Sequence, residues 1–256
     1  MGLLAWPLLA ASTAAAASVC QGYVGQTIAP VPIASVIDGL TAVERRGPYE
    51  SKAEYQQRLA AANAAANPQP VIVDRPWPQG NATYEPDTGT MRLYSFNLGH
   101  GRLSYKPLLG PDFDAGQDSF GGIGFEVTRT VPPPTTYDAT NGFGARFAVE
   151  LTQEKIDALF EGPLKLGESP FVGKKSSKLG QLKLSPELAR SIIEQGGTAF
   201  LVVPKAPFIS HGAYNIAPSF SFPREIVKDV RVLWADVRCA LIYDGAKRVV
   251  TAFDVK

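Results

Sequence analysis

Apolar and polar residues alternate with a period of two along most of the chain, which is the pattern of half-buried β-strands. Residues 244–245 (Asp-Gly) lie between two such segments and are typical of a two-residue hairpin turn. Residues 86–89 (Pro-Asp-Thr-Gly) separate two others and place proline and glycine where a turn requires them. The predicted strands are residues 71–73, 82–85, 90–96, 123–131, 143–151, 237–243 and 248–253. The chain is therefore predicted to end in a β-hairpin that pairs with a larger sheet.

The first predicted helix covers residues 51–66, which are rich in alanine, glutamine and arginine. Ser51 and Glu54 have the spacing of a capping box, in which each side chain accepts a hydrogen bond from the other residue's backbone N–H. Asn67-Pro68 ends this helix because proline cannot continue it.

Two more helices are predicted within the strand pattern. Ser185 is a favourable N-cap, proline follows it at the first helical position, and Gly196-Gly197 ends that helix. The segment from Thr152 to Phe160 begins with a similar spacing of a hydroxyl residue and a glutamate, so we expect it to be helical too. The fold class expected from these elements is α+β, with a β-rich antiparallel sheet or partly closed barrel and a few short helices.

The N-terminus has the composition of a secretory signal peptide. No charged residue precedes Asp38, and an apolar stretch ends in Ala15, Ala16 and Ala17, small residues that suit signal peptidase. The stretch is too short for a membrane span, although the usual initial Lys or Arg is missing. We expect a signal peptide at 1–17, an extended N-terminal arm at 18–47 and one α+β domain at 48–256. A subdomain boundary near residue 135 and an uncleaved apolar N-terminal helix are the alternatives.

The two cysteines of the chain are Cys20 and Cys239. In an oxidising compartment, two cysteines in one chain most often pair, so we predict a disulfide between them. Val19 fits poorly before a lipidated cysteine, which disfavours a lipoprotein. The alternative is a buried thiol at Cys239 and a mobile Cys20. The expected location is periplasmic or secreted, with no membrane span after signal cleavage.

Composition and charge exclude some classes of protein. The formal net charge is +1 and no basic face is visible, so we expect no nucleic-acid partner. Glycine and proline are scattered, which suits many short strands joined by turns. Gly-x-Ser-x-Gly is absent, and no His or Cys pair has zinc-ligand spacing, so no cofactor is expected.

The residues that remain available for chemistry lie in two predicted long loops, 98–122 and 204–223. His100 and His211 are candidate bases or binding residues, although Ser210 beside His211 does not by itself make a catalytic pair. Trp77 and Tyr214 are candidate aromatic walls of a binding site. The carboxylates suited to calcium are Asp112, Asp114 and Asp118. The two loops are expected either to line one shared cleft or to be separate surface loops.

Tyr49 to Arg58 reads Tyr-Glu-Ser-x-x-Glu-Tyr-x-x-Arg, and Val230 to Arg238 reads Val-x-x-x-Trp-x-x-x-Arg before the terminal hairpin. These stretches resemble segments of uncharacterised secreted or periplasmic bacterial proteins. The resemblance implies export and an α+β fold, and it implies no activity. The expected function is that of an exported, non-catalytic envelope or secreted protein that binds an envelope partner or small ligand. The alternatives are a periplasmic hydrolase using His211 or His100, and a calcium-stabilised module.

Export predicts that the mature protein lacks the first 17 residues or a similar number. Intact-mass measurement of protein recovered from the periplasm or medium should give a start near Ser18. A cytoplasmic protein that retains Met1 would contradict this prediction.

Overall fold

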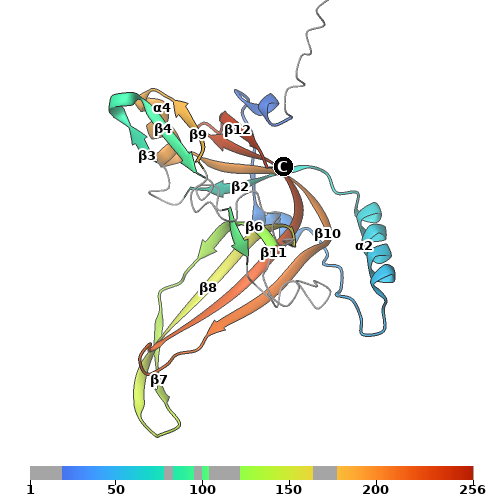
Figure 1. Ribbon diagram of the computed structural model, residues 1–256, viewed down its shortest axis with the longest axis vertical. Coiled ribbons are helices and arrows are strands. Elements are labelled where there is room, and N and C mark those ends of the chain that lie inside the picture. The colour runs from blue at the N-terminus through green and yellow to red at the C-terminus, as the bar shows by residue number, and fades with distance from the viewer. Residues whose placement is uncertain (1–18, 78–82, 95–99, 104–121, 164–177, 256) are drawn as a thin grey trace, which may run out of the picture.

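The computed structural model describes residues 19–77, 83–94, 100–103, 122–163 and 178–255 (Figure 1). It is β-rich, with 52% strand and three α-helices among these residues, as predicted. The α-helices are α1 (Ile33–Asp38), α2 (Lys52–Ala66) and α4 (Pro186–Gln195), and the short 3-10 helices are η1 (Gln21–Tyr23) and η2 (Pro86–Thr88). The strands are β1 (Val31–Pro32), β2 (Val71–Pro76), β3 (Thr83–Glu85), β4 (Thr90–Tyr94), β5 (His100–Leu103), β6 (Gly122–Thr130), β7 (Thr135–Thr140), β8 (Arg146–Pro163), β9 (Lys178–Lys183), β10 (Gly197–Ile216), β11 (Arg224–Tyr243) and β12 (Val249–Asp254).

Nine strands form one mixed sheet in the order β1-β2-β10-β11-β8-β6-β5, with β12 paired to β11 and β7 paired to β8. Its path ends at β1 and β5, so these strands do not close a barrel. The sheet is not purely antiparallel, because β1 pairs with β2 and β8 with β11 in parallel. The chain between β8 and β11 is long enough for a parallel crossover. A second, antiparallel sheet has the order β3-β4-β9.

The local predictions that rest on helix caps are confirmed, whereas the terminal turn is longer than the two residues predicted, since residues 244–248 join β11 to β12. Ser51 and Glu54 make both hydrogen bonds of the capping box at the start of α2. Ser185 caps α4, and its side chain accepts from the backbone N–H of Leu188. Strands β11 and β12 form the predicted terminal hairpin around Asp244.

The predicted helix from Thr152 to Phe160 is wrong, because these residues lie within β8. Strand β8 is paired on one side with β11 and on the other with β6 and β7. Pairing on both sides satisfies the backbone groups of β8. Ile156 and Ala158 are buried on one face of the strand, and Leu159 is buried on the other. Tertiary pairing therefore overrides a local sequence that resembles a helix start.

The predicted loop 204–223 is also mostly strand, because β10 continues to Ile216. The pairing of β10 with β11 shifts register between Pro204 and Ile209 and then resumes. Prolines lack the N–H that a ladder needs, so this sequence produces a bulge within a long strand. Only residues 217–223 form the turn to β11.

The long strands divide the molecule into a body and a projection (Figure 1). In the body, α1, β2, β10 and β11 contribute to a large apolar core that includes Ile33, Phe200 and Leu233. Beyond the body, β7 and the adjoining ends of β8, β10 and β11 extend together away from it. We call this projection, residues 135–155 and 211–229, the distal sheet.

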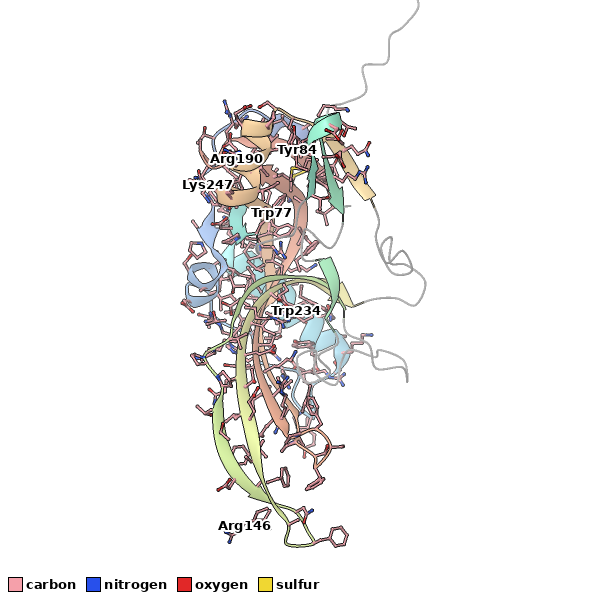
Figure 2. The ribbon with its side chains drawn as sticks, turned by 90° about the vertical axis from the view of Figure 1, so that its left-hand side faces the viewer. Trp77, Tyr84, Arg146, Arg190, Trp234 and Lys247 are labelled. Carbon is pink, nitrogen blue, oxygen red and sulfur yellow. A yellow bond between two sulfur atoms is a disulfide. The ribbon has the colours of Figure 1, made fainter. Side chains whose placement is uncertain are left out.

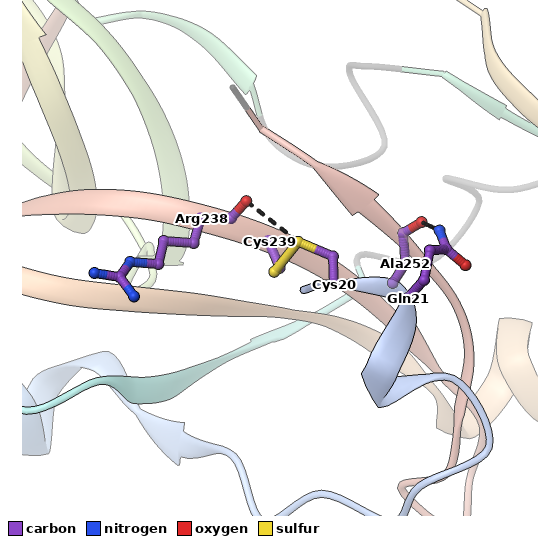
Figure 3. Close-up of a disulfide and its surroundings, with 5 residues drawn as sticks. All are labelled: Cys20, Gln21, Arg238, Cys239 and Ala252. Atoms are coloured by element: carbon purple, nitrogen blue, oxygen red, sulfur yellow. Dashed lines mark hydrogen bonds between the residues drawn. A yellow bond between two sulfur atoms is a disulfide. The ribbon is translucent and has the colours of Figure 1, made fainter. Parts of the chain in front are cut away.

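The N-terminal segment is joined to the end of the chain by a disulfide between Cys20 and Cys239 (Figure 3). Both cysteines are buried. The side-chain N–H of Gln21 donates to the carbonyl of Ala252 at 2.9 Å. Backbone hydrogen bonds of Gly25, Gln26 and Ile28 with residues 247–249 continue this attachment. Residues 18–47, expected as an extended arm, thus include β1, α1 and a segment fixed along the terminal hairpin.

Removal of the disulfide should destabilise the protein strongly, because the bridge spans 219 residues. Closing a loop of that length raises the free energy of the unfolded chain by about 5 kcal/mol. Removal of a native disulfide from small secreted domains typically lowers the free energy of unfolding by about 2–5 kcal/mol. The double variant C20A/C239A should therefore unfold at much lower guanidinium concentration than the wild type. Wild-type protein unfolded in reductant is the control and should match the variant; equal midpoints for variant and oxidised wild type would contradict the prediction.

Candidate functional site

A cavity of about 250 Å³ lies where the N-terminal segment and α2 meet the bulge of β10. We call it the His211 cavity. Helix α2 lies beside β10 in Figure 1. The residues that line the cavity are Ala42, Val43, Glu44, Arg45, Tyr55, Pro207, Ile209, Ser210, His211 and Trp234.

The bulge of β10 forms one wall of the cavity. Its backbone groups are bonded to two other parts of the chain: Val43 N–H donates to the Pro207 carbonyl at 3.0 Å, and Ala206 N–H donates to Oδ1 of Asn63 at 2.7 Å. These bonds hold the N-terminal segment and α2 against the strand. A regular strand would present a straight edge here, whereas the bulge of β10 bends the strand and leaves a hollow beside it.

The opposite wall is held by Arg58 of α2. Its guanidinium donates to both carboxylate oxygens of Glu50, at 2.9 and 2.8 Å, and to the carbonyls of Glu44 and Arg45, at 3.0 and 3.3 Å. The bonds from Arg58 lower the pKa of the Glu50 carboxyl below its ordinary value. The guanidinium also lies 5.0 Å from the centroid of the Tyr55 ring. The backbone at residues 44–45 is therefore fixed beside the cavity.

Trp234 of β11 forms the base of the cavity and is only 5% exposed. Its indole N–H donates to the hydroxyl of Ser210 at 2.8 Å, and its ring meets Phe160 edge-on with centroids 4.6 Å apart. The bond from the indole fixes the Ser210 hydroxyl. Neighbouring residues of a strand point to opposite faces, so Ser210 and His211 are not arranged as a nucleophile and its base.

His211 lies at the exposed edge of β10, where its carbonyl accepts from Arg45 Nη2 at 3.4 Å. Its partner across the strand pair is Arg231. Arg231 donates to both oxygens of Asp157 at 2.7 and 2.9 Å and to Asp38 at 2.9 Å. These carboxylates raise the pKa of Arg231, so it remains charged and joins β11 to β8 and α1.

Trp77 and His211, both predicted site residues, do not share a cavity. The Trp77 indole N–H donates to Thr198 Oγ1 at 2.5 Å, and Trp77 packs against the body core. Thr198 lies thirteen positions before His211 on β10, and Figure 2 places Trp77 well away from Trp234 along the long axis. Trp77 is therefore not a wall of the His211 cavity.

The other predicted site residues are only partly described. His100 begins β5 and Tyr214 lies in β10, and nothing further is described for either side chain. Asp112, Asp114 and Asp118 lie outside the described residues, as does most of the loop 98–122. The shared cleft between two loops and the calcium site stay predictions.

The sequence reasoning missed Tyr55, Arg45 and Trp234 as cavity residues. Two stretches singled out by resemblance, Tyr49 to Arg58 and Val230 to Arg238, contain two of these residues. They are almost two hundred positions apart and meet at this cavity. The cavity offers aromatic surface from Tyr55 and Trp234, together with polar groups from the rim, which is the composition of a small-ligand site.

Removal of the Arg231 side chain should destabilise the protein, because Asp157 would keep a largely buried charge without its partner. We expect R231M to lose about 1.5–3 kcal/mol of unfolding free energy, measured by denaturant titration. The matched control is R224M on the same strand, since that guanidinium is 57% exposed and lies 3.5 Å from Glu150. Its loss should stay under about 1 kcal/mol; equal losses in the two variants would contradict the prediction.

Three findings apply to the described chain as a whole. Among residues 19–77, 83–94, 100–103, 122–163 and 178–255, no group of three His, Cys, Asp or Glu residues is placed to hold a metal ion. No helix in the same ranges is both long and apolar enough to cross a membrane. No protein-family model matches the chain, and no curated protein or solved structure matches it either.

Proposed function

We propose that this chain is an exported, non-catalytic binding protein that takes a small ligand in the His211 cavity. The observation that supports it most is the convergence of the bulge of β10, the Arg58-held segment 44–45 and Trp234 on one hollow. Each wall is fixed by hydrogen bonds that do not involve a ligand. A site that is formed in advance loses less conformational entropy when a ligand binds.

The periplasm or the extracellular medium is the proposed location. The disulfide between Cys20 and Cys239 supports it, since such bonds form and persist in oxidising compartments. The apolar N-terminus and the alanine run before Ser18 support cleavage of a signal peptide.

The proposed ligand is a small aromatic acid. Tyr55 is half-buried and offers most of the aromatic surface, since Trp234 is only 5% exposed, and Arg45 and His211 at the rim offer N–H donors. A carboxylate suits an arginine because the guanidinium can donate two parallel hydrogen bonds. The cavity volume of about 250 Å³ is just below the usual range for drug-sized ligands, so the ligand should be small.

A hydrolase that uses His211 has less support. The Ser210 hydroxyl accepts from Trp234, and the two neighbouring side chains project from opposite faces of β10. A binding role uses the same histidine as a donor and needs no such pair. The calcium-stabilised module depends on residues 112–118 and stays an alternative proposal.

Benzoate is a suitable probe of the cavity, and saturation-transfer NMR measures its binding. We expect a Kd on the order of 1 mM, as for a ligand of this size. R45Q and H211A should each weaken binding at least about fivefold, because each removes a donor at the rim.

The matched control for the arginine variant is R190Q, since Arg190 lies on α4 near the far end of the body (Figure 2). R190Q should bind benzoate as the wild type does. Absence of benzoate binding, or equal binding by wild type, R45Q and H211A, would reject this ligand class.

A further inference from the structure

The far end of the distal sheet presents exposed phenylalanines that the His211 cavity does not use. Phe143 is 99% exposed, Phe220 72% and Phe222 44%. They lie in two turns, residues 141–145 between β7 and β8 and residues 217–223 between β10 and β11. We call these two turns the distal tip. Large apolar side chains exposed together at one end of a molecule usually mark an interaction surface.

The distal tip contains no charged residue. Its turns read Asn-Gly-Phe-Gly-Ala and Ala-Pro-Ser-Phe-Ser-Phe-Pro, and an arginine follows each of them, Arg146 and Arg224. Figure 2 places Arg146 near the end of the projection. The nearest carboxylates are those of Asp138, which is exposed in β7, of Glu150, which lies 3.5 Å from Arg224, and of Glu225, which accepts from Tyr137 and Asn215. Along the projection Phe143 lies beyond Arg146, whereas the ring of Phe220 lies beside Phe147, the residue after Arg146. Arginines beside exposed phenylalanines suit the boundary between the acyl chains and the phosphates of a bilayer.

Several backbone N–H groups of the tip are bonded within the turns. In the first turn, Asn141 accepts from Phe143, Gly144 and Ala145 through its side chain or carbonyl. In the second, Ser219 and Phe222 bond each other's backbone groups. Turns whose backbone groups bond each other carry fewer unpaired N–H groups into a lipid interface.

The exposed phenylalanines of the tip are few. Three phenylalanine side chains bury about 450–750 Å² if fully covered, which is only part of the about 800 Å² that each partner contributes to a stable protein interface. Insertion of a few aromatic side chains into a lipid interface needs no such minimum area.

We propose that the distal tip inserts its phenylalanines into the interfacial region of a phospholipid bilayer and so places the body at a membrane surface. Arg146 and Arg224 then lie near lipid phosphates. The tip touches the membrane only at its surface. This role does not depend on a ligand in the His211 cavity.

Flotation with vesicles of phosphatidylethanolamine and phosphatidylglycerol tests the proposal on the full disulfide-bonded chain. Wild-type protein should float with the vesicles, and F143S/F220S/F222S should bind at least tenfold less. F143S alone should bind the vesicles severalfold more weakly than the wild type. This variant keeps the ring contact between Phe147 and Phe220, so it tests the tip without disturbing that packing. Y49S is the matched control, because Tyr49 is 98% exposed before α2 and should leave binding unchanged.

The wild type and all variants have the same apolar N-terminus, so a difference in vesicle binding between them is due to the tip. Thermal unfolding at the wild-type temperature shows that each variant is folded. Wild-type protein that stays unbound, or tip variants that float like the wild type, would overturn the proposal. Wild-type protein that stays unbound and forms a dimer which the triple variant lacks would instead assign the tip to a second copy, and it would also overturn the proposal.

Discussion

The antiparallel pairing of β10 with β11 is the interaction on which the rest of the structure depends. These strands have 20 residues each and pair from Gly197 opposite Tyr243 to Ile216 opposite Ile226, with an interruption between Pro204 and Ile209. In the body the pair is extended by β2 and β12 and supplies much of the apolar core. Toward the tip, the described strands that extend it are β8 and β7. One strand pair therefore joins the core, the cavity and the tip, so a change of register would displace all three.

The irregularity in this pair forms one wall of the His211 cavity. Between Pro204 and Ile209 the ladder is interrupted, and the freed backbone groups bond Val43 and Asn63 instead. Arg58 fixes the facing segment through Glu50 and two carbonyls. The hollow is thus built from defined hydrogen bonds on both sides. A buried backbone group without a partner is costly, so such a bulge is stable only where other segments supply the missing bonds.

The body and the distal sheet differ in how their strands are covered. Around the disulfide, Cys20, Cys239 and Tyr243 lie in a buried cluster, and the N-terminal segment is bonded along β12. In β7, by contrast, both faces are largely exposed. The disulfide and the buried cluster around it lie in the body, and the exposed aromatic turns lie at the end of the projection. A rigid body with a projecting sheet can place a ligand site and a surface contact at separate points, which is the arrangement our two proposals use.

The sequence by itself determined the features that depend on neighbouring residues: the capping box of Ser51 and Glu54, the N-cap at Ser185, and the terminal hairpin around Asp244. Its two cysteines also predicted the disulfide. Only the tertiary structure decided that Thr152 to Phe160 is a strand, since its partners β6 and β11 are distant in sequence. The same holds for the site, where His211 was predicted but Tyr55 and Trp234 were not. A cap is settled within a few residues, whereas a strand or a cavity wall depends on partners that only folding brings near.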